Sequence, residues 1–372
     1  MDNSIQIDLI KKNKNLLENK EMEEMEEREE REEREENNVQ EYAFKRKIKI
    51  LNFFLQNEMK ISDIVKKIPY FYDDFNILID IRDIKLANIN NKIIEEFDLT
   101  SLSLIKDEKY MLCRYNNEKS INFTTFIFNL PTPKLFIFHI LDSYKDLLTK
   151  IIKLNESRLC FFNLSAKNVY FTRKYTPMIK NFEKSLLIHD LTNGYISTVI
   201  EDTEDFIDKP LEVHVLFYLI KNDEITLSYT FIESICDNYV NQLNILYFFS
   251  ENYRNSYKNA CIESLKKYIN KPKKMIIQDI LQYVNTWDNY SLSILYLYVF
   301  CNTIKVFSLQ DTFMNKMLII FLKNIDPEPF KRETLTNTLF FHNKLYNDNI
   351  EWRFINAINE NKMKEIRKSF IL

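Results

Sequence analysis

A single glycine, Gly194, is the feature that most restricts what this chain of 372 residues can fold into. Phosphate-binding loops need several glycines in a short stretch, because only glycine lets the backbone approach a phosphate closely and adopt positive φ angles. The Gly-x-Gly-x-x-Gly and Walker loops are therefore absent from the sequence. A nucleotide site built on such a loop is excluded, although the 45% of hydrophobic residues are enough for a large core.

Charge and cysteine usage exclude further classes of protein. Residues 21–36 hold eleven Glu against three Arg, a charge of −8, so the formal net charge of −3 leaves +5 for the remainder. Neither value is typical of a dedicated nucleic-acid binder. The cysteines lie far apart and form no C-x-x-C pair, which predicts reduced, buried thiols in an intracellular protein. They are Cys113, Cys160, Cys236, Cys261 and Cys301.

Hydropathy predicts a soluble, cytoplasmic protein with no membrane partner. Residues 1–17 mix Asp, Lys and Asn with apolar residues, and so lack the continuous apolar stretch of a signal peptide. The longest apolar runs, 294–301 and 317–322, are much shorter than the ~20 residues that a membrane span requires.

The first part of the chain combines an acidic arm with a small sheet. The arm, residues 1–40, repeats Glu-Glu-Arg without an apolar stripe, which predicts disorder or a solvated helix. Apolar residues near a helical period then predict an amphipathic helix over 42–59. Short β-branched and aromatic runs predict a small antiparallel sheet, which Pro131 and Pro133 close. These runs are 75–81, 84–89, 102–105 and 110–115.

The second part is mainly helical. Apolar residues at i, i+3, i+4 and i+7 predict a long helix over 135–154. Three very short extended pieces are expected next, at 159–162, 169–172 and 178–180, and helical periods dominate from Leu211 onward. The predicted fold class is therefore α+β.

Five short motifs follow one another in the order found in protein kinases. In that order they resemble the catalytic loop, the D-F-G motif, the A-P-E motif and two late motifs of the kinase family. They are Phe-Phe-Asn-Leu-Ser-Ala-Lys-Asn-Val-Tyr at 161–170, Ile-Lys-Asn-Phe-Glu at 179–183, Pro-Leu-Glu at 210–212, Asp-Asn-Tyr-Ser-Leu-Ser at 288–293, and Asp326-Pro327 with Arg332-Glu333-Thr334. The resemblance implies a bilobal kinase-like fold, with a truncated small β lobe over 41–130 and an enlarged helical lobe over 131–372.

The resemblance also implies roles for three asparagines. Asn163 stands in place of the catalytic Asp, Asn168 matches the metal-binding Asn, and Asn181 replaces the Asp that holds magnesium. An amide cannot accept a proton as a carboxylate does, and it is a poorer ligand for a hard cation. No lysine can be assigned to the strand position, so ATP and Mg are expected to bind weakly through Asn168 and Asn181, or not at all.

Three further residues are implied to be structural. In kinases the Glu of A-P-E pairs with the late Arg, so Glu212 and Arg332 should form a buried ion pair although 120 positions separate them. Asp288 should accept hydrogen bonds from backbone amides of the catalytic loop. The stretch between Glu212 and Asp288 is longer than the family needs, and a helical insertion is expected at about 225–285.

These features predict a pseudokinase that binds a protein partner and transfers no phosphate. Its composition, which is typical of an A/T-rich genome, and its reduced small lobe resemble kinase-like proteins of large nucleocytoplasmic DNA viruses, which implies the host cytoplasm or the virion. The alternative is an active serine/threonine kinase in which Glu183 or Asp190 serves the metal. A second alternative is a helical interaction protein unrelated to kinases, in which Glu212 and Arg332 lie far apart.

Other candidate residues carry weaker signals. The four histidines have no metal-ligand spacing, and His139 is expected in or beside the core, while His214 is expected to anchor the segment before it; the others are His189 and His342. Ser165 has no neighbouring histidine base, so nucleophilic hydrolysis has no support. The basic turn of Lys271, Lys273 and Lys274 is predicted to be a solvated loop, with docking of an acidic partner as the alternative.

Overall fold

The computed structural model describes residues 45–85, 108–116, 119–203, 206–222, 226–310, 312–347, 354–355 and 358–369. The described residues from Arg46 onward belong to one compact unit, and Lys45 precedes it. The acidic arm, the expected strand at 102–105 and most of the strand at 84–89 lie outside the described residues.

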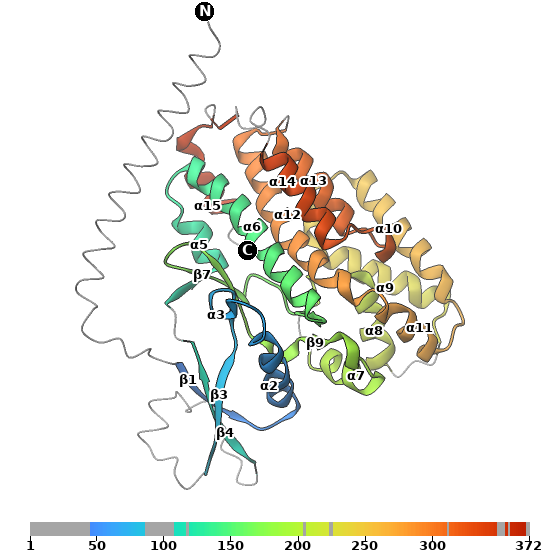
Figure 1. Cartoon of the computed structure of the whole chain (residues 1–372). Coiled ribbons are helices and arrows are strands. Elements are labelled where there is room, and N and C mark those ends of the chain that lie inside the picture. The colour runs from blue at the N-terminus through green and yellow to red at the C-terminus, as the bar shows by residue number, and fades with distance from the viewer. Residues whose placement is uncertain are drawn as a thin grey trace, which may run out of the picture. The chain divides into compact units, whose positions relative to one another are not determined.

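The first sheet has three strands in the order β1-β4-β3 (Figure 1). β1 spans Lys45–Ile50, β3 spans Leu78–Ile84 and β4 spans Tyr110–Tyr115, and β3 pairs with β4 in antiparallel register. Helix α2, Phe53–Val65, begins after Asn52, whose side chain caps it by accepting a hydrogen bond from the backbone amide of Leu55. The expected strand at 110–115 is confirmed.

The expected helix over 42–59 is wrong in its first half. Residues 45–50 form a strand because lysine and isoleucine alternate with a period of two up to Ile50. The Asn52 cap then sets the start of a helix that continues to Val65. Read as one segment, the apolar residues of the strand and of the helix imitate a single helical period.

A second sheet joins this region to the helices. Its strands lie in the order β2-β8-β7-β5, with β7 antiparallel to β8 and to β5 and with β2 parallel to β8. A two-residue strand, β6, pairs with β9. The three short extended pieces expected after the long helix are confirmed, at slightly different bounds. The strands are β2 Phe75–Asn76, β5 Ser120–Asn122, β6 Leu159–Cys160, β7 Val169–Thr172, β8 Pro177–Lys180 and β9 Leu186–Leu187.

Two long helices form the centre of the core. The long helix predicted over 135–154 is present as α6, Pro133–Glu156, which begins after a Thr132 cap. It packs along α12, Trp287–Phe307 (Figure 1). The stretch Val284–Phe307 is long and apolar enough to cross a membrane, but 78% of its most apolar window is buried inside the protein, as in a core helix.

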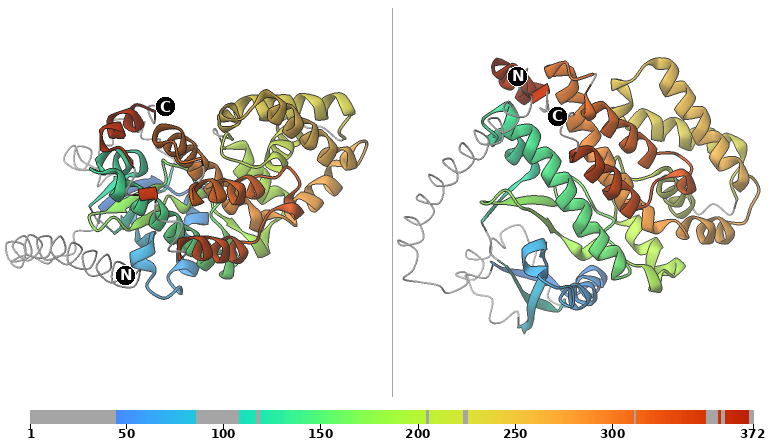
Figure 2. Two further views of the ribbon diagram at one scale, coloured as in Figure 1. Left: turned by 90° about the horizontal axis from the view of Figure 1, so that it is seen from above. Right: turned by 45° about the horizontal axis from the view of Figure 1, so that its top comes forward.

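The remaining helices pack around this pair, and the chain has the mixed α+β composition that the sequence predicts. Helices α9, α10 and α11 follow α8 and lie on the opposite side of α12 from the first sheet (Figures 1 and 2), and the interpretation of this stretch as an insertion stays a prediction. The helices are α3 Phe71–Asp74, α5 Phe123–Asn129, α7 Asn193–Glu201, α8 Leu211–Lys221, α9 Tyr229–Gln242, α10 Glu251–Leu265, α11 Lys273–Leu281, α13 Phe313–Asn324, α14 Leu335–Tyr346 and α15 Met363–Ser369.

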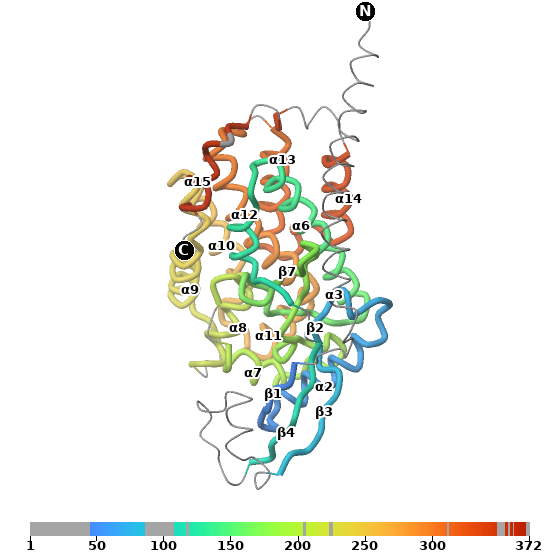
Figure 3. Tube along the Cα trace, turned by 90° about the vertical axis from the view of Figure 1, so that its left-hand side faces the viewer, coloured from blue at the N-terminus to red at the C-terminus, as the bar shows by residue number. Residues whose placement is uncertain are grey.

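Burial divides the core into two clusters. The large one runs from α2 and the second sheet through α6 and α12 into helices α8 to α11. The small one lies under the first sheet, where Leu55 packs against Leu78 and Cys113. Figure 3 shows the first sheet and α2 at one end of this unit, with α13 towards the other end. The expected division into a small lobe that ends at residue 130 and a helical lobe that begins at residue 131 stays a prediction.

Two histidines, the buried His342 and the half-buried His214, should make the fold sensitive to acid. Burial lowers the pKa of His214 and of His342 to about 4, from an ordinary value of 6.5. Between these values the unfolded chain binds more protons than the folded one, so stability is present above pH 6.5 and is lost as the pH falls towards 4. We expect a loss of up to about 3 kcal/mol per histidine.

Urea denaturation between pH 7 and pH 4.5 measures this loss. Because carboxylates also contribute in acid, the informative quantity is the difference between the wild type and His342→Leu, whose stability should fall less steeply. His189→Gln, at an exposed histidine, serves as the control and should follow the wild type. Identical slopes for all three proteins would contradict the prediction.

Candidate functional site

Strand β1 and helix α2 bring a lysine and a glutamate together. Nζ of Lys49 lies 2.8 Å from Oε2 of Glu58 and 3.1 Å from Oε2 of Glu183. Glu58 is buried, and the hydroxyl of Tyr115 donates to the same Oε2 at 3.1 Å. Burial alone would lower the pKa of Lys49, but the negative charges of Glu58 and Glu183 raise it well above its ordinary value. Lys49 is therefore held as a cation.

Sequence reasoning missed both Lys49 and Glu58. The lysine was not assigned because residues 45–50 were expected to be helical and no strand was available to carry it. The signal was nevertheless present, since an alternating Lys-Ile-Lys-Ile run precedes a helix cap at Asn52. Glu58 then lies on the buried face of the helix that follows.

Two hydrogen bonds connect the three asparagines of the sequence analysis. Nδ2 of Asn181 donates to Oδ1 of Asn168 at 2.6 Å, and Nδ2 of Asn168 donates to the backbone carbonyl of Asn163 at 2.8 Å. Asn181 has a φ of 68°, in the left-handed region that Asn tolerates better than most residues. The structure thus brings two of the side chains together and contributes the backbone of the third.

This arrangement offers a cation very little negative charge. Asn181 uses its amide group to occupy Oδ1 of Asn168, so the pair presents neutral carbonyl oxygens, whereas Mg²⁺ prefers carboxylates and water. Within the described residues, no group of three or more His, Cys, Asp or Glu side chains is placed to hold a metal ion.

Asp288 fixes the loop that carries Asn163. The backbone amides of Phe161 and Phe162 donate to its two carboxylate oxygens at 2.7 and 2.8 Å. Phe162 has a φ of 63°, which is strained for a bulky side chain and costs about 1–3 kcal/mol. Burial raises the pKa of Asp288, and the two amide hydrogen bonds oppose that rise. The contact expected from the sequence is present, and it holds a strained backbone in place.

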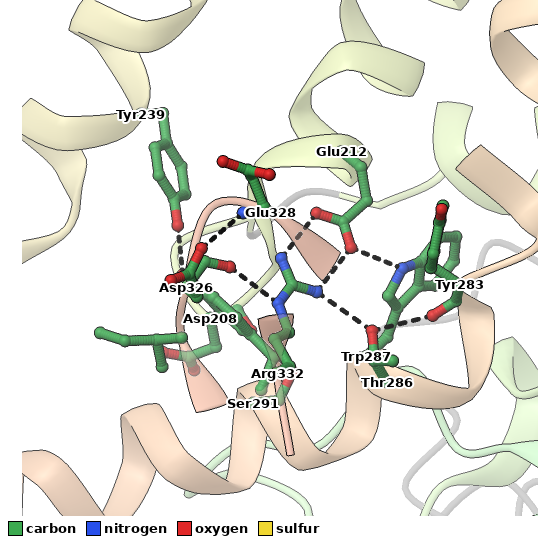
Figure 4. A network of polar contacts seen from close by, with 12 residues as sticks. Asp208, Glu212, Tyr239, Tyr283, Thr286, Trp287, Ser291, Asp326, Glu328 and Arg332 are labelled. Atoms are coloured by element: carbon green, nitrogen blue, oxygen red, sulfur yellow. Dashed lines mark hydrogen bonds and ion pairs between the residues drawn. The ribbon is translucent and has the colours of Figure 1, made fainter. Parts of the chain in front are cut away.

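Glu212 and Arg332 form a bidentate ion pair (Figure 4). Nη1 of Arg332 lies 2.6 Å from Oε1 of Glu212, and Nη2 lies 2.9 Å from Oε2. The two side chains are only 1% and 4% exposed. Nε1 of Trp287 also donates to Glu212, and Nε of Arg332 donates to the carbonyl of Asp326. The wide separation that would have excluded the kinase resemblance is therefore not found.

Of the other candidate residues, Glu183 lies in this site, beside Lys49, and the rest lie outside it. Asp190 is exposed in the short helix Ile188–Asp190. Nε2 of His214 lies 3.0 Å from the carbonyl of Phe206, which ties α8 to the segment before it, as expected. His139 is partly buried against the rings of Phe126 and Tyr175.

A cavity of about 420 Å³ lies elsewhere, between α7 and α8. It is mostly apolar, with one acidic and one basic residue in its lining. Its lining contains none of the three asparagines, so it is separate from the site described above. The lining residues are Ile200, Glu201, Thr203, Phe206, Phe217, Ile220 and Lys221.

Comparison with known proteins identifies no family for this chain. No family model and no curated protein matches it. Among solved structures, the twitchin kinase region from C. elegans (Fn31-NL-kin-CRD-Ig26) is similar at a TM-score of 0.42 and 12% sequence identity. The match covers 88% of this chain and 45% of that one. Nothing in these comparisons points to a viral protein.

Removal of one partner of the Glu212–Arg332 pair should destabilise the fold strongly. Glu212→Met leaves the Arg332 guanidinium buried without its counter-charge, at an expected cost of about 3–5 kcal/mol in the free energy of unfolding. The double variant Glu212→Met/Arg332→Met leaves no unpaired charge, and it should recover much of this loss. Urea denaturation of four proteins, namely the wild type, Glu212→Met, Arg332→Met and the double variant, gives the coupling energy.

An exposed ion pair provides the control for this experiment. Glu263→Gln removes the partner of Lys266 on the surface of α10, and should leave the free energy of unfolding close to that of the wild type. If the double variant at 212 and 332 loses the sum of the two single losses, the two residues act independently and the interpretation is wrong.

Proposed function

We propose that this chain is a kinase-like protein that transfers no phosphate and acts as a scaffold for a protein partner, that is, a pseudokinase. One observation carries the proposal. The side-chain nitrogen of Asn181 donates to the side-chain oxygen of Asn168. The kinase resemblance places the metal-binding Asp at position 181 and the metal-binding Asn at position 168.

The chemistry of phosphoryl transfer explains why this contact matters. The protein contributes mainly positioning and the neutralisation of phosphate charge by magnesium and basic groups. A neutral amide at position 181 removes one negative charge from the metal site and occupies the oxygen of Asn168. Asn163 likewise lacks the general-base contribution of a carboxylate, typically ~10²–10⁴ in rate.

The surroundings of Lys49 support the same proposal. In kinases the strand lysine pairs with a helix glutamate and contacts the nucleotide phosphates. Here Glu183, in place of the small Gly of the D-F-G motif, adds a second carboxylate at 3.1 Å from the ammonium. One cation and two anions leave this cluster with a charge of −1. An incoming phosphate would have to displace Glu183 and approach a like charge.

A scaffold role agrees with the types of residue found at these positions. Asp288, Glu212 and Arg332 hold the loops of the fold with ionisable side chains, whereas the positions that would serve catalysis carry asparagine. The insertion also presents large apolar side chains to solvent, among them Tyr229, Tyr247 and Met275. We place the partner surface on this insertion and the protein in the cytoplasm.

One observation favours an active kinase instead. The ion pair of Lys49 and Glu58 has the arrangement that phosphate transfer requires. In that case Glu183 would have to leave Lys49 and serve a metal ion.

Thermal unfolding with ATP and magnesium tests the proposal. The wild type should show no metal-dependent rise in Tm and no transfer of labelled phosphate. Asn181→Asp/Glu183→Gly restores a carboxylate and frees Lys49, and it should gain a metal-dependent rise of several degrees, because a ligand at a hundred times its Kd stabilises by about 2.7 kcal/mol.

Asn252→Asp, which introduces one carboxylate on the exposed face of α10, is the control for the new carboxylate at position 181 and should show no rise. A metal-dependent rise in the wild type that Asn168→Ala abolishes would overturn the proposal in favour of an active kinase.

A further inference from the structure

One side chain, Asn57, holds helix α2 against the backbone that follows Asn181. Its Nδ2 donates to the carbonyl of Glu183 at 2.9 Å and to the carbonyl of Ser185 at 2.8 Å. Both amide hydrogens are therefore used, and a flipped amide would point its own oxygen at two carbonyl oxygens. The orientation of Asn57 is thus fixed by its surroundings, inside a buried contact.

Tyr195, from the first turn of α7, completes this contact. Its hydroxyl lies 2.8 Å from Oδ1 of Asn57 and 2.9 Å from the carbonyl of Ser185, and it shares its proton between them. The backbone amide of Leu187 donates to the same hydroxyl at 3.3 Å. Burial raises the pKa of Tyr195 to about 12, so the hydroxyl stays protonated. Its ring lies against Phe53, the first residue of α2.

The other end of α7 is tied to the same backbone segment. Nζ of Lys184 lies 2.7 Å from a carboxylate oxygen of Asp202, the residue that caps the C-terminus of α7. The same ammonium also lies 5.8 Å from the centre of the Phe54 ring in α2. Helix α7 is thus connected at both ends to the segment between itself and Asn181, and through it to α2.

These contacts lead directly to the charged cluster. Glu58 follows Asn57 in α2, and Glu183 contributes both the carbonyl that Asn57 holds and the carboxylate that Lys49 binds. We propose that Asn57 and Tyr195 form a latch that sets the position of α2 and so assembles the cluster of Lys49, Glu58 and Glu183. Displacement of α7 opens the latch and loosens the cluster. The latch works without nucleotide, and it does not depend on whether the chain transfers phosphate.

Tyr195→Phe tests the latch with the least disturbance, because it removes one hydroxyl and keeps the ring on Phe53. Hydrogen–deuterium exchange of the α2 amides should become about 5- to 30-fold faster, the factor that corresponds to one or two lost hydrogen bonds. Acylation of the Lys49 amine, followed by mass spectrometry, should accelerate relative to the exposed Lys274. Exchange in α12 should stay unchanged.

Asn57→Asp is the second variant, and it should have the larger effect. It keeps an oxygen for Tyr195 but turns a carboxylate, in place of two N–H donors, towards the carbonyls of Glu183 and Ser185. Tyr229→Phe, at an exposed tyrosine of α9, is the control and should leave α2 exchange as in the wild type.

Two outcomes would overturn the latch. One is unchanged α2 exchange and unchanged Lys49 acylation in Tyr195→Phe. The other is a rise in exchange that is equal in α2 and α12, which would show a general loss of stability instead of local release. If Asn57→Asp fails to fold, Tyr195→Phe decides the question alone.

Discussion

The candidate site depends on the two hydrogen bonds that the carboxylate of Asp288 accepts from backbone amides. Asp288 belongs to the core helix α12, and the donors are the amides of Phe161 and Phe162. The carbonyl of Phe161 in turn accepts the hydroxyl of Ser185 at 3.1 Å, and the carbonyl of Ser185 accepts Asn57 of α2. A continuous series of buried hydrogen bonds therefore runs from the centre of the core to the helix beside the first sheet.

Buried charges are kept in this fold where their loss would be costly. Glu212 and Arg332 are almost fully buried, so a single neutral replacement strands a charge in a medium of low dielectric constant. Asn168 and Asn181 differ, because the hydrogen bond between their two amides carries no net charge. On the proposed function, the buried ion pair and the asparagines are thus under different physical constraints, because only the loss of an ion-pair partner strands a buried charge.

The sequence allowed prediction of the elements and contacts that depend on periodicity or on motif order. The long helix α6 follows from its apolar spacing, and the contact of Glu212 with Arg332 follows from the order of the motifs. Lys49 was missed because the apolar residues of its strand and of the helix that follows, read as one segment, imitate a single helical period. Asn57 and Tyr195 could not be found from sequence at all, because their partners are mainly backbone carbonyls whose positions only the tertiary structure defines.

The charge balance around Lys49 links the proposed function to the latch. In the kinase arrangement, the positive charge of the strand lysine pairs with the negative charge of the nucleotide phosphates. Here the carboxylate of Glu183 already lies beside the ammonium, and the carbonyl of the same residue is held by Asn57. Glu183, which pairs with the Lys49 ammonium, is thus held in place by contacts that lead to α7. On this proposal, protein contacts have taken over the stabilising role of the nucleotide, so the position of α2 responds to whatever binds or moves α7.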